Sequence, residues 1–390
     1  MLLTRNTERA ATRPSTSPYD AEMPLDLDLR PSSQPVPAAE RAAALADPGF
    51  GRYFTDHMAT ARWTFDDGWH DAAVHPLEPF TLHPAAAVLH YGQEIFEGLK
   101  AYRHADGSVW LFRPDQNARR FARSAQRLAL PVLDEDDFVA AVEAVVRADA
   151  AWVPDAPDGQ ETSLYLRPFM IATEAFLGVR PAHEATFGVV ASPAGAYFSG
   201  GVHGVNLWVT DRYVRASRGG TGDAKTGGNY AASLAAQAEA RDRGCDQVLY
   251  LDGEEHAWLE EAGTMNVFLV TADGELLTPA LGSILEGVTR DSLLELAPDL
   301  GLTPVERRVG LAELRERLAD GSVTEVFAAG TAAVITPVVG IRGEDGTGAG
   351  YEQQVGDGTP GATSLRLRST LLDLQYGRTP DLRGWLRRVV

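Results

Sequence analysis

The chain of 390 residues has one cysteine, Cys245, and two lysines, Lys100 and Lys225; arginine supplies the other basic side chains. A single cysteine excludes a disulfide within the chain and a metal site built from several cysteines, and we expect no metal. Low cysteine usage is typical of a reducing compartment, so we expect a cytoplasmic protein. No apolar run approaches the length that spans a membrane. With so few lysines, the place of each one is informative.

Basic charge is also scarce. The chain has 35 lysine and arginine residues against 54 aspartate and glutamate residues, a formal net charge of −19, and no basic run interrupts that acidity. Such a surface repels nucleic acid and anionic membranes, so we expect neither as a partner. The apolar fraction of 44% and the charged fraction of 23% are ordinary for a globular enzyme. The length allows about two domains with well-filled cores.

Composition divides the chain into four parts. Residues 1–37 are rich in Thr, Ser, Pro, Arg and Asp and lack the apolar region of a secretory signal, so we expect a flexible arm. Residues 38–191 and 205–390 each mix strand and helix patterns, and the Gly-, Ala- and Ser-rich residues 192–204 are expected to link them. Because strands and helices do not alternate strictly, the sequence predicts an α/β (mixed α+β) fold in two domains.

Several individual elements follow from local patterns. Residues 115–128 are expected to form a helix, with Asp115 after Pro114 as its N-cap. An alanine-rich helix is expected over residues 231–243. Residues 343–361 are rich in glycine, so we expect a loop or a hairpin there.

Lys225 lies in the glycine-dense segment 219–230, whose backbone can bend closely around a bound group. Arginine cannot form an imine with an aldehyde, whereas a lysine amine with a lowered pKa can. Two interpretations of this segment have similar weight. It is either a solvated loop with an incidental lysine, or a loop that binds an aldehyde through that lysine.

Three other features could bind a phosphate. Residues 287–289 begin a predicted helix, so free backbone amides and the helix dipole point toward any anion there. The small-residue turn at 330–332 contains a hydroxyl, and Arg120 offers a guanidinium fork. Each feature is weak alone. Together with a lysine in a glycine loop they favour an aldehyde cofactor that carries a phosphate, which is pyridoxal phosphate.

A carboxylate is the next requirement of such a cofactor, because its ring nitrogen must stay protonated for it to act as an electron sink. Glu260 and Glu261 are adjacent at the edge of a predicted strand. An acidic turn without a catalytic role explains an isolated pair of glutamates more simply. The residues alone therefore leave this choice open.

The order and spacing of these motifs resemble the branched-chain amino-acid aminotransferases, of the class IV pyridoxal phosphate fold. The resemblance runs from about Phe50 to about Ile341. The segments that carry it are FTDHM at 54–58, LHY at 89–91, FEGLKAY at 96–102, LFRP at 111–114, YLRP at 165–168, KTGGNY at 225–230, EAGTMN at 261–266, GVTR at 287–290 and GTA at 330–332.

The resemblance implies a function and an assembly. The activity would be transamination between branched-chain L-amino acids (leucine, isoleucine and valine) and 2-oxoglutarate, giving branched-chain 2-oxo acids and L-glutamate, with pyridoxal 5′-phosphate as cofactor. A smaller N-terminal domain and a larger C-terminal domain would enclose the active site between them. The assembly would be a homodimer.

The resemblance also implies residues that hold the cofactor. Lys225 would bind it covalently and then carry the proton between the substrate Cα and the cofactor C4′. Tyr230 would hydrogen-bond the ring oxygen and Glu261 the ring nitrogen. Arg215 matches a family arginine near the site. The groups that would hold the phosphate are Arg120, the amides of Val288 and Thr289, and Thr331.

The substrate would meet a second set of residues. Those that would receive its carboxylate are Tyr91, Thr264 and the turn of Thr331, Ala332 and Ala333. The residues that would line the apolar side-chain pocket are Phe50, Phe96 and Tyr165. Arg167 would meet the distal carboxylate of glutamate or 2-oxoglutarate. Lys100 belongs to a family motif without a catalytic role, and we interpret it as a cation at the surface or just behind the site.

Two alternatives stay open. A D-amino-acid aminotransferase or an aminodeoxychorismate lyase of the same fold would be expected to lack the combination of Tyr91, Phe96 and Arg167. A phosphate-loop nucleotide-binding enzyme is more remote, because Ala224 stands where that pattern needs the glycine before the lysine. In addition, residues 211–218 are too charged for the buried parallel strand that precedes such a loop.

Overall fold

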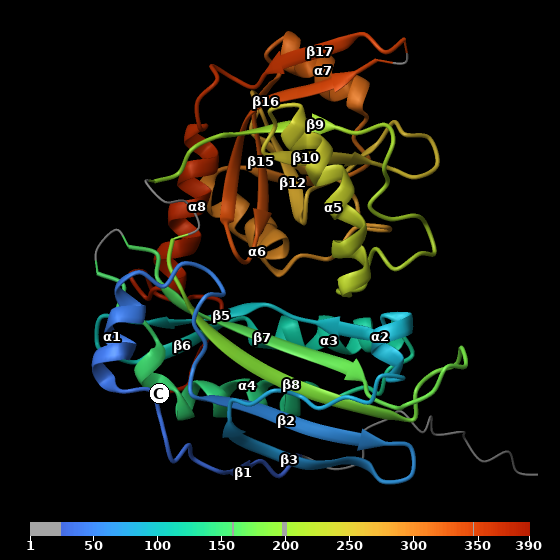
Figure 1. The fold of residues 1–390 in the computed structure, drawn as a ribbon. Coiled ribbons are helices and arrows are strands. Elements are labelled where there is room, and N and C mark those ends of the chain that lie inside the picture. Colours follow the sequence, from blue (N-terminus) through green and yellow to red (C-terminus); the bar gives the residue numbers. More distant parts are fainter. Residues whose placement is uncertain (1–24, 158–159, 197–200, 346) are drawn as a thin grey trace, which may run out of the picture.

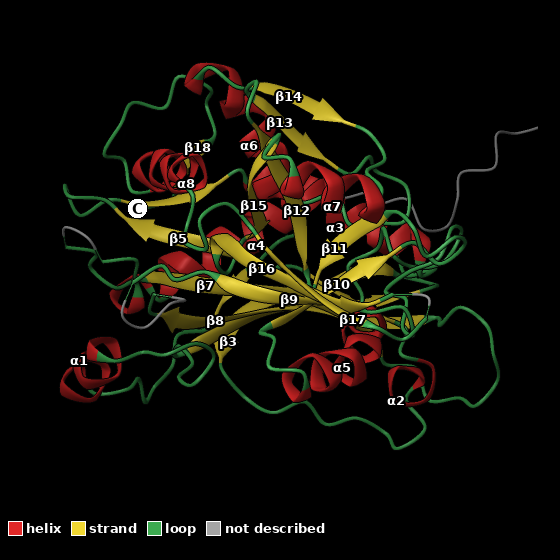
Figure 2. Ribbon diagram, turned by 90° about the horizontal axis from the view of Figure 1, so that it is seen from above, coloured by secondary structure: helices red, strands yellow, loops and turns green. Residues whose placement is uncertain are grey.

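The computed structural model describes residues 25–157, 160–196, 201–345 and 347–390, which form two sheets, one above the other (Figure 1). Each sheet carries helices of its own, and strands and helices do not alternate strictly. The mixed α/β fold in two halves that the sequence predicts is therefore confirmed. Seen from above, the strands of both sheets overlap in the middle of the molecule, with the helices around them (Figure 2).

The first sheet comes almost entirely from the N-terminal half. Its strands are β1 (Asp28–Leu29), β2 (His57–Thr64), β3 (Gly68–Pro76), β4 (Glu94–Phe96), β5 (Leu99–Arg103), β6 (Val109–Phe112), β7 (Ser163–Ala172), β8 (Glu184–Ala194) and β18 (Leu386–Arg388). The order is β1-β3-β2-β8-β7-β5-β6-β18, and β4 pairs with β7. Buried side chains alternate with half-buried ones along the central strand β7.

Helices cover this sheet. They are α1 (Ala38–Ala46), α2 (Ala87–Tyr91), α3 (Pro114–Arg127), α4 (Glu135–Ala148) and the short turn η1 (Ala150–Trp152). Three fully buried rings join α3 and α4 to the strand β8: Phe121, Phe138 and Phe187, with centroids 5.1 to 6.2 Å apart. This aromatic contact fixes α3, which carries part of the site described below.

The second sheet is built from the C-terminal half. Its strands are β9 (Val205–Val209), β10 (Gln247–Leu251), β11 (Leu259–Ala262), β12 (Met265–Thr271), β13 (Glu275–Thr278), β14 (Thr303–Glu306), β15 (Val323–Gly330), β16 (Val334–Glu344) and β17 (Gly350–Gln354). The order is β11-β10-β9-β16-β15-β12-β13-β14, and β17 pairs with β16. The glycine-rich residues 343–361 thus contain the turn and return strand of a hairpin, one of the two outcomes expected.

The helices around this sheet are α5 (Gly227–Asp242), α6 (Val288–Leu296), η2 (Ala297–Leu300), α7 (Leu311–Ala319) and α8 (Ala362–Gln375). One apolar cluster joins the two halves, because Tyr102 and Phe112 of the first sheet pack with Leu367 and Leu371 of α8 and with Phe268 of β12. In the part of the chain that the structure describes, no helix is long and apolar enough to cross a bilayer.

Three boundaries differ from those predicted from composition. The strand β8 continues to Ala194 because it stays paired with β7 up to Ser163, so the expected linker 192–204 begins inside the first sheet. The strand β18 pairs with β6, so the end of the expected second domain, 205–390, returns to the first sheet. Asp28 and Leu29 of the expected arm 1–37 pair with β3; residues 1–24 lie outside the described ranges.

Two predicted helix starts were wrong. The helix α3 begins at Pro114, which suits the first helical position, so the N-cap is Arg113 and not Asp115. Arg113 adopts φ 47° while its guanidinium bonds Asp291 and Glu295 of α6. The helix α5 begins at Gly227 and not at 231, because a side chain from the first sheet bonds its first amide.

Candidate active site

A cavity of about 210 Å³ lies between the two halves of the molecule. Its wall contains all the site residues predicted from the sequence except Arg215 and Tyr91. The first half contributes Phe50, Phe96, Arg120, Tyr165 and Arg167. The second half contributes Lys225, Tyr230, Glu261, Thr264, Val288, Thr289, Thr331, Ala332 and Ala333. Motifs separated by more than 200 positions in the chain therefore meet in one place.

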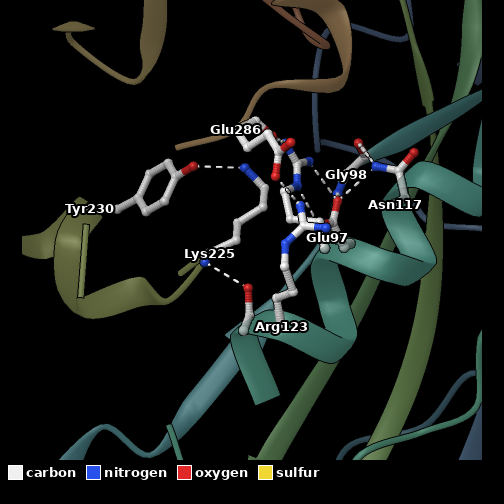
Figure 3. A network of polar contacts seen from close by, with 9 residues as sticks. Glu97, Gly98, Asn117, Arg123, Lys225, Tyr230 and Glu286 are labelled. Carbon is white, nitrogen blue, oxygen red and sulfur yellow. Dashed lines mark hydrogen bonds and ion pairs between the residues drawn. The ribbon is translucent and has the colours of Figure 1, made fainter. Parts of the chain in front are cut away.

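Lys225 enters the cavity from the loop before α5. Its Nζ donates a hydrogen bond to the hydroxyl of Tyr230 at 2.7 Å (Figure 3). The same nitrogen lies 5.0 Å from the ring centroid of Phe96, within the range of a cation–π contact. Among the described residues, no carboxylate lies within salt-bridge distance of this nitrogen, so it remains available to a ligand in the cavity.

Arg120 approaches from α3 and is held by a buried carboxylate. Its Nε and Nη2 lie 2.7 and 2.8 Å from the two oxygens of Glu97, and its Nη1 donates to the carbonyl of Glu286 at 3.0 Å (Figure 3 shows Glu97 and Glu286). Burial opposes the charge of Glu97, yet the guanidinium holds the pKa of this carboxyl below its ordinary value. A guanidinium has five N–H donors, so two remain for a ligand.

The start of α6 provides a second donor set. Gly287 is the N-cap residue and makes no side-chain cap bond, so the amides of Val288 and Thr289 have no acceptor within the helix. A Cβ on Gly287 would come within 2.1 Å of Oδ1 of Asn266, so glycine is required there. Gly330 and Thr331 face the same space. This cradle of free amides beside Arg120 suits a phosphate.

Strand geometry distinguishes the two adjacent glutamates. They follow one another on β11, so their side chains leave the sheet on opposite faces. Glu261 lines the cavity, whereas Glu260 accepts a hydrogen bond from Ser283 and lines a separate hollow of about 300 Å³. Glu261 is therefore the carboxylate available to a group bound in the cavity.

Arg215 lies behind Glu261, outside the wall of the main cavity. Its Nε is 2.5 Å from Oε2 of Glu261, and its Nη2 donates to the carbonyls of Gly222 and Ser283. Burial raises the pKa of the Glu261 carboxyl, while Arg215 acts in the opposite direction. Oε2 lies in this ion pair, but a carboxylate oxygen has two lone pairs, so Glu261, which lines the cavity, can also accept a hydrogen bond from a donor there. Sequence reasoning missed Asn266, which bonds Oε1 of Glu261 from the end of the EAGTMN motif.

Arg167 and its neighbours form the apolar end of the cavity. Its guanidinium carbon lies 4.7 Å from the ring centroid of Phe96 and 5.4 Å from that of Tyr165. Its Nη2 donates to the Tyr165 hydroxyl at 3.0 Å, while its Nε has no partner among the described residues. No described carboxylate forms a salt bridge with it. This excludes the simpler explanation of Arg167 as half of a surface ion pair.

Tyr91 does not reach this cavity. It ends α2, is 40% exposed, and donates its hydroxyl to the carbonyl of Leu177. Within one chain it is therefore not placed to receive a substrate carboxylate.

Lys100 is buried and not at the surface. Its Nζ donates at 2.9 Å to the carbonyl of Ala332, in the turn that lines the cavity. Burial lowers the pKa of Lys100 to about 8, with Glu161 acting to raise it and Arg368 to lower it. The alternative that this lysine lies just behind the site is the one that the structure supports.

Among the described residues, no group of three or more His, Cys, Asp or Glu side chains could hold a metal ion. The chemistry of the cavity wall is instead that of an amine, a buried carboxylate and an anion cradle. These groups fit the aldehyde, the ring nitrogen and the phosphate of pyridoxal 5′-phosphate respectively.

Comparison with known proteins adds independent findings. The model of the amino-transferase class IV family matches residues 94–341. The chain is 56% identical, over 361 residues, to the probable branched-chain-amino-acid aminotransferase of Streptomyces coelicolor, covering 92% of this chain and 98% of that protein.

Solved structures of branched-chain amino acid aminotransferases are also similar to this chain. The branched-chain amino acid aminotransferase of Escherichia coli superimposes with a TM-score of 0.68 at 30% identity, covering 85% of this chain and 100% of that one. The T.th. branched-chain amino acid aminotransferase with pyridoxamine 5′-phosphate superimposes with a TM-score of 0.69 at 32% identity, covering 85% of this chain and 99% of that one. The same enzyme complexed with N-(5′-phosphopyridoxyl)-L-glutamate superimposes with a TM-score of 0.67 at 31% identity.

Replacing Lys100 with Met should weaken the pH dependence of stability in the alkaline range. Between the folded pKa of about 8 and the ordinary value of 10.5, the unfolded chain binds more protons than the folded chain. The free energy of unfolding of the wild type should therefore rise relative to Lys100→Met as the pH goes from 8 to 10.5, by up to about 3 kcal/mol. Urea denaturation at both pH values measures this.

The exposed Arg62 gives a matched control, since Arg62→Met removes one positive charge that does not titrate in this range. A stability difference between wild type and Lys100→Met that is the same at both pH values would show that Lys100 keeps an ordinary pKa.

Proposed function

This chain belongs to the class IV aminotransferases, and from that premise we propose that it transfers the amino group between branched-chain L-amino acids and 2-oxoglutarate with pyridoxal 5′-phosphate as its cofactor. The observation that carries the proposal is the cavity itself. It joins Lys225, bonded to Tyr230, with apolar walls and with a guanidinium, Arg167, that has no carboxylate partner among the described residues. The names of the similar proteins support leucine, isoleucine and valine as substrates.

The cofactor would be held by residues already described. Lys225 would bind its aldehyde, Glu261 would face its ring nitrogen, and Arg120 with the first amides of α6 would hold its phosphate. When bound, pyridoxal phosphate supplies an electron sink that makes the substrate Cα proton removable. Arg215 favours the charged form of Glu261, which is the form needed to keep a ring nitrogen protonated.

Proton transfer would fall to Lys225. Once its amine is free it can take the proton from the substrate Cα and return it at a neighbouring carbon, because the Nζ projects into the cavity from a fixed backbone. The hydrogen bond to Tyr230 orients this nitrogen. The substrate carboxylate would be received by Thr264 and the turn at Ala332 and Ala333.

One pocket must accept two kinds of side chain in turn, because the amino donor and the amino acceptor use the same site. Phe50, Phe96 and Tyr165 suit a branched aliphatic chain. Arg167 would pair with the distal carboxylate of 2-oxoglutarate or glutamate. The solved enzyme complexed with a phosphopyridoxyl-L-glutamate supports glutamate as the second partner. The D-amino-acid and lyase alternatives have no such support.

We also propose that the enzyme works as a homodimer. Tyr91 is 40% exposed and bonds the carbonyl of Leu177, and the apolar side chains of Leu89, Leu177 and Val179 are 59%, 65% and 89% exposed. Large apolar side chains that are exposed in one chain suit a contact with another protein. If the predicted role of Tyr91 holds, its ring would reach the substrate of a second copy.

The cellular setting is a further proposal. One buried cysteine fits a reducing compartment, and the net charge of −19 favours small-molecule substrates over nucleic acid or an anionic membrane. We therefore propose a cytoplasmic enzyme. Cell fractionation should recover the activity in the cytoplasmic fraction, and recovery in the membrane fraction would contradict this.

Borohydride reduction of the protein loaded with pyridoxal 5′-phosphate should fix one pyridoxyl group per chain on Lys225. Peptide mapping after proteolysis locates it. Lys100 is the internal control, because it is the other lysine of the chain and is bonded to Ala332. A label on Lys100, or no label at all, would overturn the proposed function.

Arg167→Met should weaken the half-reaction with glutamate or 2-oxoglutarate by about ten- to a hundredfold and largely spare the half-reaction with leucine. The reason is the loss of one charge-assisted hydrogen-bonding partner, worth roughly 1.5–3 kcal/mol. Single-turnover kinetics measures each half-reaction, and the exposed Arg62→Met, on the same sheet, is the matched control. Equal losses for both substrates would show that Arg167 supports the fold or the cofactor.

Mixing two defective chains tests the dimer. If Tyr91 completes the site of a second copy, Lys225→Ala and Tyr91→Ala chains expressed together should regain activity, because a mixed dimer has one complete site. Random assortment would restore about a quarter of the wild-type activity per chain. Sedimentation should show a dimer in each case. A monomer with full activity, or a mixture no better than Tyr91→Ala alone, would contradict the proposal.

A further inference from the structure

The backbone around Lys225 is bonded from the other half of the molecule. The Lys225 amide donates to Oγ of Ser124 on α3 at 2.9 Å, and the Lys225 carbonyl accepts from the amide of Phe96 on β4 at 2.9 Å. The two groups that the peptide backbone offers at this residue are therefore both fixed by the first half. The lysine belongs to the second half by sequence but takes its position from the first.

Glu94 continues this arrangement into the following helix. One of its oxygens, Oε1, accepts hydrogen bonds from the amide of Gly227 and from the hydroxyl of Thr226, the latter at 3.2 Å. Gly227 is the first residue of α5, and Thr226, its N-cap, makes no side-chain cap bond of its own. A helix offers its first amides no acceptor. Glu94 thus takes the place of the missing cap, from 133 positions away in sequence.

The short strand β4 can deliver this carboxylate because its side chains alternate. Ile95 is fully buried in the core of the first half, whereas Glu94 and Phe96, two residues apart, share the opposite face. That face meets the lysine segment: Phe96 bonds the Lys225 carbonyl and packs its ring 4.9 Å from that of Tyr230. A Cβ on Gly227 would come within 2.5 Å of Oε1 of Glu94, so glycine is needed for this approach.

The first turn of α5 carries the rest of the lysine's surroundings. Tyr230, whose hydroxyl accepts the bond from the Lys225 Nζ, is in this turn. So is Asn229, whose amide nitrogen donates to the carbonyls of Thr221 and Ala224 in the glycine loop. A shift of this turn would therefore move the ring partner of the lysine and the loop that carries the lysine at the same time.

We propose that Glu94 is a positioning residue for Lys225. By capping α5 across the domain boundary, it fixes the lysine amine and the Tyr230 hydroxyl relative to each other at the cavity. A carboxylate suits the place, because the positive end of the helix dipole adds to its two hydrogen bonds. This inference rests on the proposed function for the consequence in catalysis, but not for the structural role.

Glu94→Ala removes the acceptor, and Glu94→Gln keeps an acceptor oxygen while removing the charge. In the full chain loaded with pyridoxal 5′-phosphate, and again without added cofactor, amide hydrogen exchange at 227–230 should be about ten- to a hundredfold faster in Glu94→Ala than in the wild type. Exchange at the far end of α5, near Ala240, should stay unchanged. Glu94→Gln should exchange at an intermediate rate.

The catalytic consequence has its own signature. A loosely held lysine slows proton transfer but leaves the substrate pocket intact, so kcat should fall by about ten- to a hundredfold in Glu94→Ala while KM for leucine changes little. Glu94→Gln should recover most of the loss. The matched control is Glu184→Ala, which removes the same charge from an exposed position on the first sheet.

Three outcomes would overturn the proposal: unchanged exchange at 227–230 in Glu94→Ala, equal acceleration along the whole of α5, or a Gln variant no better than the Ala variant. If Glu94→Ala does not fold, amide exchange is measured on the wild type alone. An unprotected Gly227 amide there would show that the cap is absent. Amide exchange could be faster in Glu94→Ala while borohydride fails to label Lys225. That result would support the positioning role of Glu94 and contradict the proposed function.

Discussion

Hydrogen bonds from one half of the molecule to the backbone of the other hold Lys225 at the cavity. A lysine on a glycine-rich loop would otherwise sample many positions, because glycine leaves the backbone free to move. Here the amide and the carbonyl of Lys225 are both bonded by the first half, through Ser124 and Phe96. The cavity therefore exists as a chemical site only while the two halves keep their relative position, to which the apolar cluster around α8 contributes.

Buried charge follows a consistent pattern around this lysine. The two buried carboxylates nearest the cavity each have a guanidinium beside them: Glu97 pairs with Arg120, and Glu261 pairs with Arg215. An unpaired buried charge would be costly, which explains why these pairs stay together. In both pairs one member keeps hydrogen-bonding capacity and lines the cavity: Arg120 has two further N–H groups, and the Glu261 carboxylate has further lone pairs. The pairs thus avoid an unpaired buried charge and prepare a site for an anion and for a cationic ring nitrogen.

Local patterns in the sequence were sufficient for most of the fold, because strand alternation is a local property, whereas most residues of the cavity wall were implied by the resemblance of short motifs to a known family. These patterns gave wrong helix starts where a residue distant in sequence determines the first turn. The sequence pattern predicts a start of α5 four residues too late, since its cap comes from Glu94 in the other sheet. Asp115 was chosen as an N-cap, although Pro114 fits the first turn and Arg113 is fixed by α6. No local pattern could show these partners.

Contacts between residues distant in sequence also explain which features of the site could not be predicted. The partner of Arg120 is Glu97, and the only local signal for it was membership of the FEGLKAY motif. The sequence leaves two positions possible for Lys100, at the surface or just behind the site, because its neighbours in sequence do not show whether a lysine is buried. Tyr91 matches a motif, yet in one chain it is 40% exposed and bonds the Leu177 carbonyl outside the cavity. Its predicted role stays a prediction that depends on a second copy.

Arg167 shows how a single pocket can serve an aliphatic and an anionic side chain. A guanidinium in an apolar pocket without a carboxylate would be costly if it had no other support. Here it lies over the rings of Phe96 and Tyr165 and bonds the Tyr165 hydroxyl. Such cation–π contacts hold the charge at modest cost and present an apolar ring face to an aliphatic chain. The guanidinium makes one hydrogen bond among the described residues, so its other terminal N–H groups can recognise a distal carboxylate without rebuilding the pocket.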